Sequence, residues 1–298
     1  MPAPWPVKSA WWTSGTIGAA GPAGAIAPVC GVAAFLRRST VREASPVPTP
    51  APADRALSDI RSHGVGVLPA AFDAASIHRA RERVLAHTDL MKRTRPTPTA
   101  RHLAGFERFP ALAPLHAEIV ANAVVTDALH ELLGPSLRTI GLSDITIDRS
   151  QQWHKDLLRG DYRSFLGSDE PCAHHHGEAY KVIWYLQGSR SLQVVPGSHR
   201  HDIDLSGDEH AIPGPDVPVT VIPVEAGDAV IIDLCTTHRG ADEATYLDRA
   251  ADAPARILVS TVFAAADSAF ADRLEAGNAA RLADWDRRPA DLVIAPTA

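Results

Sequence analysis

The pattern of apolar and polar positions predicts a mixture of short helices and strands in the first half of the chain. It predicts a mainly β region in the second half. Asp73 stands where a helix N-cap is expected, and Gly134-Pro135 follows the last helical stretch of this first part. The spacing of apolar residues predicts helices over 57–63, 73–90 and 115–133, a strand over 64–69 and a pair of strands over 137–148.

Continuous apolar runs in the second half predict buried strands, because runs of this length between turn residues are typical of strands covered on both faces. They span 181–186, 227–234 and 256–263. Residues 264–285 then predict a closing helix, and 287–298 a tail. The fold class is therefore mainly β with flanking helices.

The amino-terminal stretch differs in composition from the rest of the chain. Residues 9–36 carry no charge, but glycine and proline interrupt an alanine-rich run that makes a poor helix and favours lipid only weakly. Residues 45–52 alternate proline with small residues and are expected to form an extended linker. We expect residues 1–53 to be a disordered extension and residues 54–298 to be one domain.

Composition and charge narrow the functional classes. With 298 residues, of which 45% are hydrophobic, the chain can bury one large core. A net charge of −6 gives no support for binding nucleic acid or an anionic membrane, so the expected partner is a small-molecule substrate. Three separated cysteines (Cys30, Cys172 and Cys235) indicate neither a disulfide framework nor a zinc site and suit a reducing cytoplasm. Oligomeric state is left open.

His154-Lys155-Asp156 is the first half of a candidate metal site. A histidine and a carboxylate two positions apart point the same way from an extended backbone. His238 follows a predicted buried strand and supplies a second imidazole. Two histidines and one carboxylate on one face of an ion are typical of non-haem Fe(II) oxygenases. His-x-Asp alone is common on solvated loops, so the order of the surrounding strands is what favours a metal.

Arg256 opens the last predicted strand and needs an anionic partner. A dicarboxylate such as 2-oxoglutarate matches the guanidinium group with two parallel hydrogen bonds, and Ser260 is placed to add a hydroxyl group. These residues are the candidate co-substrate site.

Several motifs in this order resemble the phytanoyl-CoA dioxygenase superfamily of Fe(II)/2-oxoglutarate oxygenases, over about residues 59–263. The resemblance implies a double-stranded β-helix (jelly-roll, cupin-like) core, iron held by His154, Asp156 and His238, 2-oxoglutarate anchored by Arg256, and Lys181 as a further co-substrate contact. It also implies consumption of O2, release of succinate and CO2, and hydroxylation of an unactivated C–H bond. The motifs are 152–156, 181–186, 195–200 (Val-Pro-Gly-Ser-His-Arg), Gly227-Asp228, His238 and Arg256.

The chain departs from the superfamily pattern at two places. The hairpin at 187–191 is short, and the spacing from His238 to Arg256 is long, which leaves Arg249 as a rival co-substrate anchor. Asp156 occupies the position where related halogenases lack a carboxylate. Halogenation is therefore disfavoured.

Two loops are candidates for selecting the substrate. The insertion at 157–180 starts at the predicted metal ligand Asp156 and carries a histidine triplet at 174–176. Consecutive residues cannot all face one ion from a regular backbone, so the triplet is read as part of the substrate mouth or as exposed loop. The basic stretch at 92–101 is either a solvated loop or a lid. His199 is read as a turn residue.

Two other functional classes fit the same barrel. A cupin-like metal protein or isomerase would bind the metal without 2-oxoglutarate chemistry, and a non-catalytic module would keep only the fold. The substrate is also open, because an acyl-CoA thioester needs a basic groove, whereas a secondary metabolite or amino acid needs only a smaller pocket.

Overall fold

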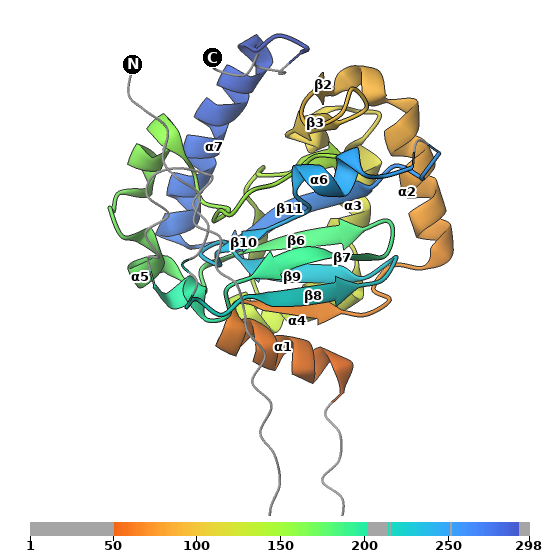
Figure 1. Cartoon of the computed structure of the whole chain (residues 1–298). Helices are drawn as coiled ribbons and strands as arrows, with labels where there is room; N and C mark the ends of the chain where they lie inside the picture. Colours follow the sequence, from red (N-terminus) through yellow and green to blue (C-terminus); the bar gives the residue numbers. More distant parts are fainter. Residues whose placement is uncertain (1–50, 202–213, 215, 251, 292–298) are drawn as a thin grey trace, which may run out of the picture. The chain divides into compact units, whose positions relative to one another are not determined.

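A computed structural model describes residues 51–201, 214, 216–250 and 252–291 (Figure 1). The expectations for the amino-terminal extension and for most of the carboxyl-terminal tail fall on residues outside these ranges. Within them, no helix is both long enough and apolar enough to cross a membrane.

The larger sheet is antiparallel and contains eight strands. Its order is β1-β9-β6-β11-β5-β3-β2, and β4 pairs with β11 beside this path. The central strands β6, β9 and β11 are the buried runs expected from the sequence. The strands are β1 (Val65–Leu68), β2 (Lys92–Arg93), β3 (Arg101–Ala104), β4 (Leu137–Thr139), β5 (Asp144–Ile147), β6 (Ala179–Tyr185), β9 (Ala229–Asp233) and β11 (Ile257–Ala265).

The smaller sheet has the order β10-β7-β8, formed by β7 (Ser189–Val194), β8 (Thr220–Val224) and β10 (His238–Arg239). An antiparallel bridge between His154 and His238 extends it by one more segment. From β5 onward the chain passes repeatedly from one sheet to the other, as a double-stranded β-helix requires. The predicted jelly-roll core is therefore confirmed.

Alternate side chains of β6 enter two different cores. Val182 and Trp184 pack in the cluster between the larger sheet and the helices, where Phe72 stacks on Trp184 at 4.0 Å between ring centroids. Ile183 and Tyr185 pack with residues of the smaller sheet. The second face is the interior of the barrel, and Lys181 shares it by the same alternation.

Helices cover the larger sheet, with α1 and α4 grouped below the strands and α7 to one side in Figure 1. Asp73 caps α2 as expected, because its carboxylate accepts a hydrogen bond from the backbone N–H of Ser76 at 2.7 Å. The helices are α1 (Pro52–His63), α2 (Ala74–Ala86), α3 (Ala113–Val120), α4 (Ala123–Leu133), α5 (Pro171–His175), α6 (Glu243–Leu247) and α7 (Ala269–Arg287). Four 3₁₀ helices connect them: η1 (Thr88–Leu90), η2 (Phe106–Arg108), η3 (Gly160–Leu166) and η4 (Ser198–Arg200).

Several boundaries expected from the sequence were wrong, and three of them have a clear physical reason. The helix over 115–133 is two helices, because the Asn122 side chain accepts from the backbone N–H of Val125 and starts α4. Pro52 is the first residue of α1 rather than the end of a linker, a position that tolerates proline because its N–H has no helical partner. The closing helix starts at Ala269 rather than 264, because β11 runs to Ala265 and Ser268 caps α7.

Candidate metal centre

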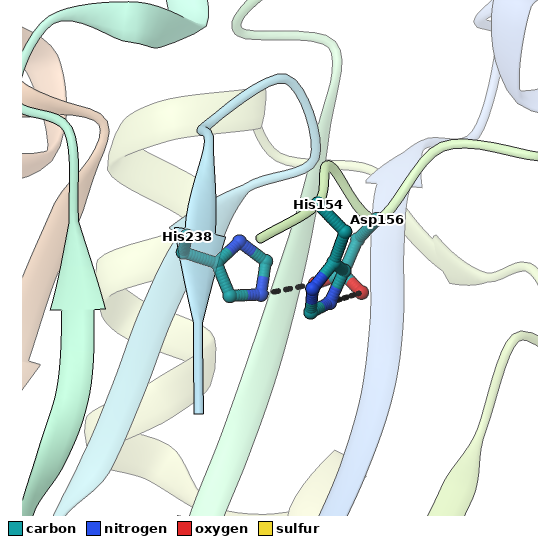
Figure 2. A group of neighbouring side chains, drawn as sticks. All are labelled: His154, Asp156 and His238. Carbon is teal, nitrogen blue, oxygen red and sulfur yellow. Dashed lines mark ion pairs between the residues drawn. The ribbon is translucent and has the colours of Figure 1, made fainter. Parts of the chain in front are cut away.

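His154, Asp156 and His238 converge on one point in the structure (Figure 2). One ligand atom from each lies within 4.8 Å of the others. The Asp156 carboxylate lies 3.6 Å from Nε2 of His154 and 3.4 Å from Nε2 of His238. All three side chains are buried or nearly so. The spacing suits three ligands of a single ion, with the other coordination positions left to exogenous molecules.

The backbone holds the two halves of this triad together. His154 and His238 exchange two backbone hydrogen bonds of 2.8 Å each, and the N–H of Asp156 donates to the carbonyl of Leu234 at 3.1 Å. The segment before β6 is thereby paired with the segment after β9, about 80 residues later in the chain. These pairings set the distance between the imidazoles.

Each imidazole is also oriented by a carbonyl close to it in sequence. Nδ1 of His154 lies 2.6 Å from the carbonyl of Gln152, and Nδ1 of His238 lies 2.9 Å from that of Thr236. A carbonyl oxygen can only accept, so Nδ1 carries the proton and donates in both residues. Nε2 is then left unprotonated for a metal.

The protonation states match those of a metal site. Burial lowers the pKa of His154 to about 3 and also lowers that of His238. Burial alone would raise the pKa of Asp156, but Lys181 and the two imidazoles bring it well below its usual value. Asp156 Oδ2 is buried and has no hydrogen-bond partner among the described residues. Two neutral imidazoles and a carboxylate with an unused oxygen fit a divalent ion.

Lys181 lies directly beside the triad. Its Nζ is 2.9 Å from Oδ1 of Asp156, and the side chain faces the barrel interior. The expectation that it heads its strand was wrong, because β6 begins at Ala179 and Lys181 is its third residue. This register is what carries the ammonium group to the metal ligands.

The structure places Arg256 at the other end of the barrel. Its guanidinium donates to Ser189 Oγ at 2.8 Å and to Tyr246 OH at 3.3 Å. Val262, not Arg256, pairs with Lys181, so six residues of β11, roughly 20 Å of strand, separate Arg256 from the triad's level. Arg256 does not line the cavity at the triad that is described below.

The other two residues proposed for the co-substrate also have partners of their own. Ser260 Oγ donates weakly to the carbonyl of Asp144 at 3.4 Å. Arg249 forms an ion pair of 2.6 Å with Asp148 and donates to the carbonyl of Ala253 at 3.0 Å. Neither residue lines the triad's cavity.

Lys155, between the two ligands of the first half, fastens this segment to its neighbours. Its ammonium donates to the carbonyls of Ser198 at 2.9 Å and His201 at 3.2 Å, and also to that of Cys235. Ser198 in turn accepts from the backbone N–H of Thr237, next to His238, at 2.8 Å. The Pro-Gly-Ser-His turn therefore supports both halves of the triad.

Replacing Lys155 with methionine is expected to weaken metal binding by about 10–100-fold, because the ligand loop loses three hydrogen bonds that orient it. Calorimetric titration with Co(II) measures the change. Lys92→Met is the matched control, since Lys92 also donates to backbone carbonyls, those of Trp285 and Arg288, but bonds to neither half of the triad nor to the Pro-Gly-Ser-His turn. Equal Co(II) affinity in the two variants would contradict this role.

A cavity of about 1100 Å³ opens in front of the triad. The first residues of the 157–180 insertion and the last turns of α7 line it, together with Arg95 from the basic stretch and Glu243 from α6. The full lining is Thr94, Arg95, His102, Leu142, Asp144, Arg149–Gln152, His154, Asp156–Tyr162, Lys181, Glu243, Arg281, Asp284, Trp285 and Arg288.

The histidine triplet of the insertion takes no part in this cavity. His175 pairs with Glu178 at 2.9 Å and stacks on Phe270, and His176 Nδ1 lies 3.1 Å from the carbonyl of Cys172. Within the described ranges, the triad is the only group of three potential ligands that converge. The triplet supports the insertion's own structure.

Sequence reasoning missed one wall of the cavity. His102 on β3, Asp144 on β5 and Arg281 on α7 come together there, 3.7 Å separating His102 Nε2 from Asp144 Oδ2 and 3.2 Å separating Arg281 Nη2 from Asp144 Oδ1. These residues are far apart in the chain and carry no motif. Only the β3–β5 pairing and the packing of α7 unite them.

The stability of the protein should fall as pH is lowered from 6.5 to 4, in part because of His102. Burial lowers its pKa to about 4, so over this range the unfolded imidazole binds a proton that the folded one does not. This contribution is fully present above pH 6.5 and is lost towards pH 4. Between pH 7 and 4.5, His102→Phe should therefore lose about 2 kcal/mol less stability than the wild type. Urea unfolding at both pH values measures the loss of stability in each protein. Equal losses in the variant and the wild type would refute the role of His102.

Solved structures resemble this fold, although no protein-family model matches the chain and no curated protein matches its sequence. SnoN, a non-heme α-ketoglutarate-dependent epimerase from nogalamycin biosynthesis, superposes with a TM-score of 0.54 at 20% identity, over 74% of this chain and 89% of SnoN. HygX from Streptomyces hygroscopicus, solved with nickel, 2-oxoglutarate and hygromycin B, gives 0.53 at 16% identity, over 72% and 87%. AviO1 from Streptomyces viridochromogenes Tue57 gives 0.52 at 15% identity, over 74% and 98%. At these identities the likeness shows the fold.

Proposed function

We propose that this protein is a non-haem Fe(II)- and 2-oxoglutarate-dependent dioxygenase that oxidises a small organic molecule, releasing succinate and CO2. The observation that carries the proposal is the buried His154–Asp156–His238 triad on a double-stranded β-helix, at the base of a large cavity. SnoN and HygX, which share the fold, were solved with Fe3+ or nickel together with the same co-substrate. Membership of the phytanoyl-CoA dioxygenase superfamily is part of this proposal.

Each residue of the site has a separate role in the proposed reaction. His154, Asp156 and His238 would hold the iron, which when bound supplies oxidising power from O2 and the keto acid. Asp156 stays ionised at neutral pH, and the two imidazoles stay neutral, so no proton has to leave the ligands before the metal binds. Lys181 offers an ammonium group beside Asp156 for a carboxylate of the co-substrate. We place hydroxylation first among the possible outcomes.

Similar folds support other outcomes of the same oxidation. SnoN is an epimerase and SnoK, with a TM-score of 0.50 and 17% identity, is a carbocyclase. For this chain, the way in which the cavity holds the substrate would decide between hydroxylation, epimerisation and ring closure. Mass spectrometry of the product separates them, because hydroxylation adds one oxygen atom, ring closure removes two hydrogen atoms and epimerisation leaves the mass unchanged.

The proposal is tested by succinate formation from 2-oxoglutarate by the Fe(II)-loaded protein under air, first alone and then with a library of small molecules. We expect slow succinate release without substrate and faster release with a subset of the library. A cupin-like metal enzyme, the alternative on this barrel, would bind Fe(II) but release no succinate under either condition. That result would overturn the proposal.

Lys181→Met is expected to raise the KM for 2-oxoglutarate by about 10–100-fold, because a charged hydrogen bond to a carboxylate contributes roughly 1.5–3 kcal/mol. Arg256→Met tests the anchor expected from the sequence, whose guanidinium faces Ser189 and Tyr246. Succinate release at varied 2-oxoglutarate measures both. A raised KM in the Arg256 variant alone would assign the co-substrate to the far end of the barrel.

A further inference from the structure

The cavity wall formed by His102, Asp144 and Arg281 contains a polar atom that forms no hydrogen bond with any described residue. His102 Nε2 is buried and has no hydrogen-bond partner, because its distance of 3.7 Å to Asp144 Oδ2 is too long for a hydrogen bond. His102 is 6% exposed as a residue, and its side chain lines the cavity, packed edge-on against Trp285 at 4.7 Å between ring centroids. Leaving such a group unpaired is costly, so its position in a cavity wall indicates a ligand.

The neighbouring charges decide which ligand suits this wall. Asp144 pairs with Arg281 at 3.2 Å, and Lys181 is near enough to help lower the pKa of Asp144. Arg149, which also lines the cavity, is near enough to help lower the pKa of His102. A carboxylate or phosphate placed here would be repelled by Asp144. An ammonium group would be repelled by Arg281 and Lys181. A hydroxyl group fits, since it donates to the carboxylate and accepts from a nitrogen donor at the same time.

We propose that His102, Asp144 and Arg281 form a subsite that binds an uncharged hydroxyl group of the substrate, which is therefore a polyol or a sugar-like molecule. The inference rests on the proposed function in one respect, namely that the bound molecule is the one oxidised. The wall, Lys181 and the triad residues His154 and Asp156 all line the same cavity, so a hydroxyl bound at the subsite would bring a nearby C–H bond of the substrate towards the triad.

The rest of the lining is consistent with an uncharged, polar substrate. Six lysines and arginines face five aspartates and glutamates around the cavity. Arg95 pairs with Glu243 at 2.9 Å and Arg288 with Asp284 at 2.8 Å, so donors and acceptors stand side by side. An acyl-CoA thioester, which brings several phosphate charges, would need an excess of cations. The volume of about 1100 Å³ also exceeds what a single amino acid fills.

Three probes that share one ring test the subsite: cyclohexane-1,2-diol, cyclohexanecarboxylate and cyclohexylamine, which is an ammonium ion at pH 7. Saturation-transfer NMR on the full chain, metal-free and again with Zn(II) and 2-oxoglutarate, ranks their binding. We expect the diol to bind most tightly, and His102→Phe to weaken it on the order of 10-fold while keeping the ring packed on Trp285.

Two variants that each remove one charge should change, in opposite directions, which of the three probes binds most tightly. Asp144→Asn leaves Arg281 and Lys181 without this counter-charge, so cyclohexanecarboxylate should overtake the diol. Arg281→Met removes the cation instead, so cyclohexylamine should gain. Asp272→Asn is the matched control, since Asp272 is also on α7 and pairs with an arginine, Arg138, but is exposed and outside the cavity lining. The Asp272→Asn variant should bind the three probes in the same order of affinity as the wild type.

Three results would overturn the subsite. They are tighter binding of either charged probe by the wild type, no binding of any probe, and a ranking unchanged in Asp144→Asn and Arg281→Met. Calorimetric titration of Zn(II) and 2-oxoglutarate is run separately on the same samples. Failure of the proposed function appears there as absent co-substrate binding, whereas failure of the subsite appears only in the probe ranking of the metal-free protein.

Discussion

His238→Ala is expected to abolish iron binding and all succinate formation while the protein stays folded. Only two ligands remain, one of them the carboxylate already paired with Lys181, and two ligands from this site do not hold a divalent ion against water. His154→Ala should behave in the same way. Iron per protein after anaerobic reconstitution measures the effect, and circular dichroism confirms folding.

His78→Ala is the matched control for both variants. His78 is a histidine on the exposed face of α2, paired with Glu82 at 3.2 Å and remote from the triad in the fold. Its iron content should equal that of the wild type. Undiminished iron in both His154→Ala and His238→Ala would show that the ion, if there is one, binds elsewhere.

Replacing Asp161 and Tyr162 together with alanine is expected to lower substrate-dependent turnover by about 100-fold or more. Both residues line the cavity at the start of the insertion, and small misplacement of a substrate costs rates of this order. Neither contacts the triad, so Co(II) affinity and succinate release without substrate should stay within a few-fold of the wild type. The substrate is the compound that most accelerates succinate release in the library screen.

Glu170→Ala, an exposed residue of the same insertion outside the cavity lining, is the control and should leave turnover unchanged. Loss of metal binding in the Asp161/Tyr162 variant would contradict the separation of substrate selection from the oxidation chemistry. So would turnover equal to that of the control, which would assign selection to other walls of the cavity.

The three residues of the triad were predictable because local patterns point to each of them, although the long-range bridge between His154 and His238 sets the distance between the two imidazoles. His154 and Asp156 share one side of an extended backbone by period-two alternation, and a buried apolar run places His238 at a strand end. The buried strands followed from the same apolar runs, whereas the jelly-roll core was implied by the resemblance that the order of the motifs carries. The apolar pattern gave wrong helix boundaries where a single side chain caps a helix. Asn122, for example, starts a new helix inside a stretch whose apolar spacing is continuous.

Only the tertiary structure decided which charged side chains lie near the triad. Arg256 directly precedes the last strand, which begins at Ile257, but the register of β11 against β6 puts Val262 beside Lys181 and leaves Arg256 remote. A shift of a few residues in that register is invisible in the sequence, because every apolar residue in the run would still be buried.

The wall of His102, Asp144 and Arg281 was equally beyond the sequence. A strand pairing between residues about forty apart and the docking of α7, more than a hundred residues later, assemble it. The sequence by itself predicted which three residues converge as candidate metal ligands, because their chemistry depends on residue type and local spacing. The surroundings of the metal depend on long-range packing, which no local pattern encodes.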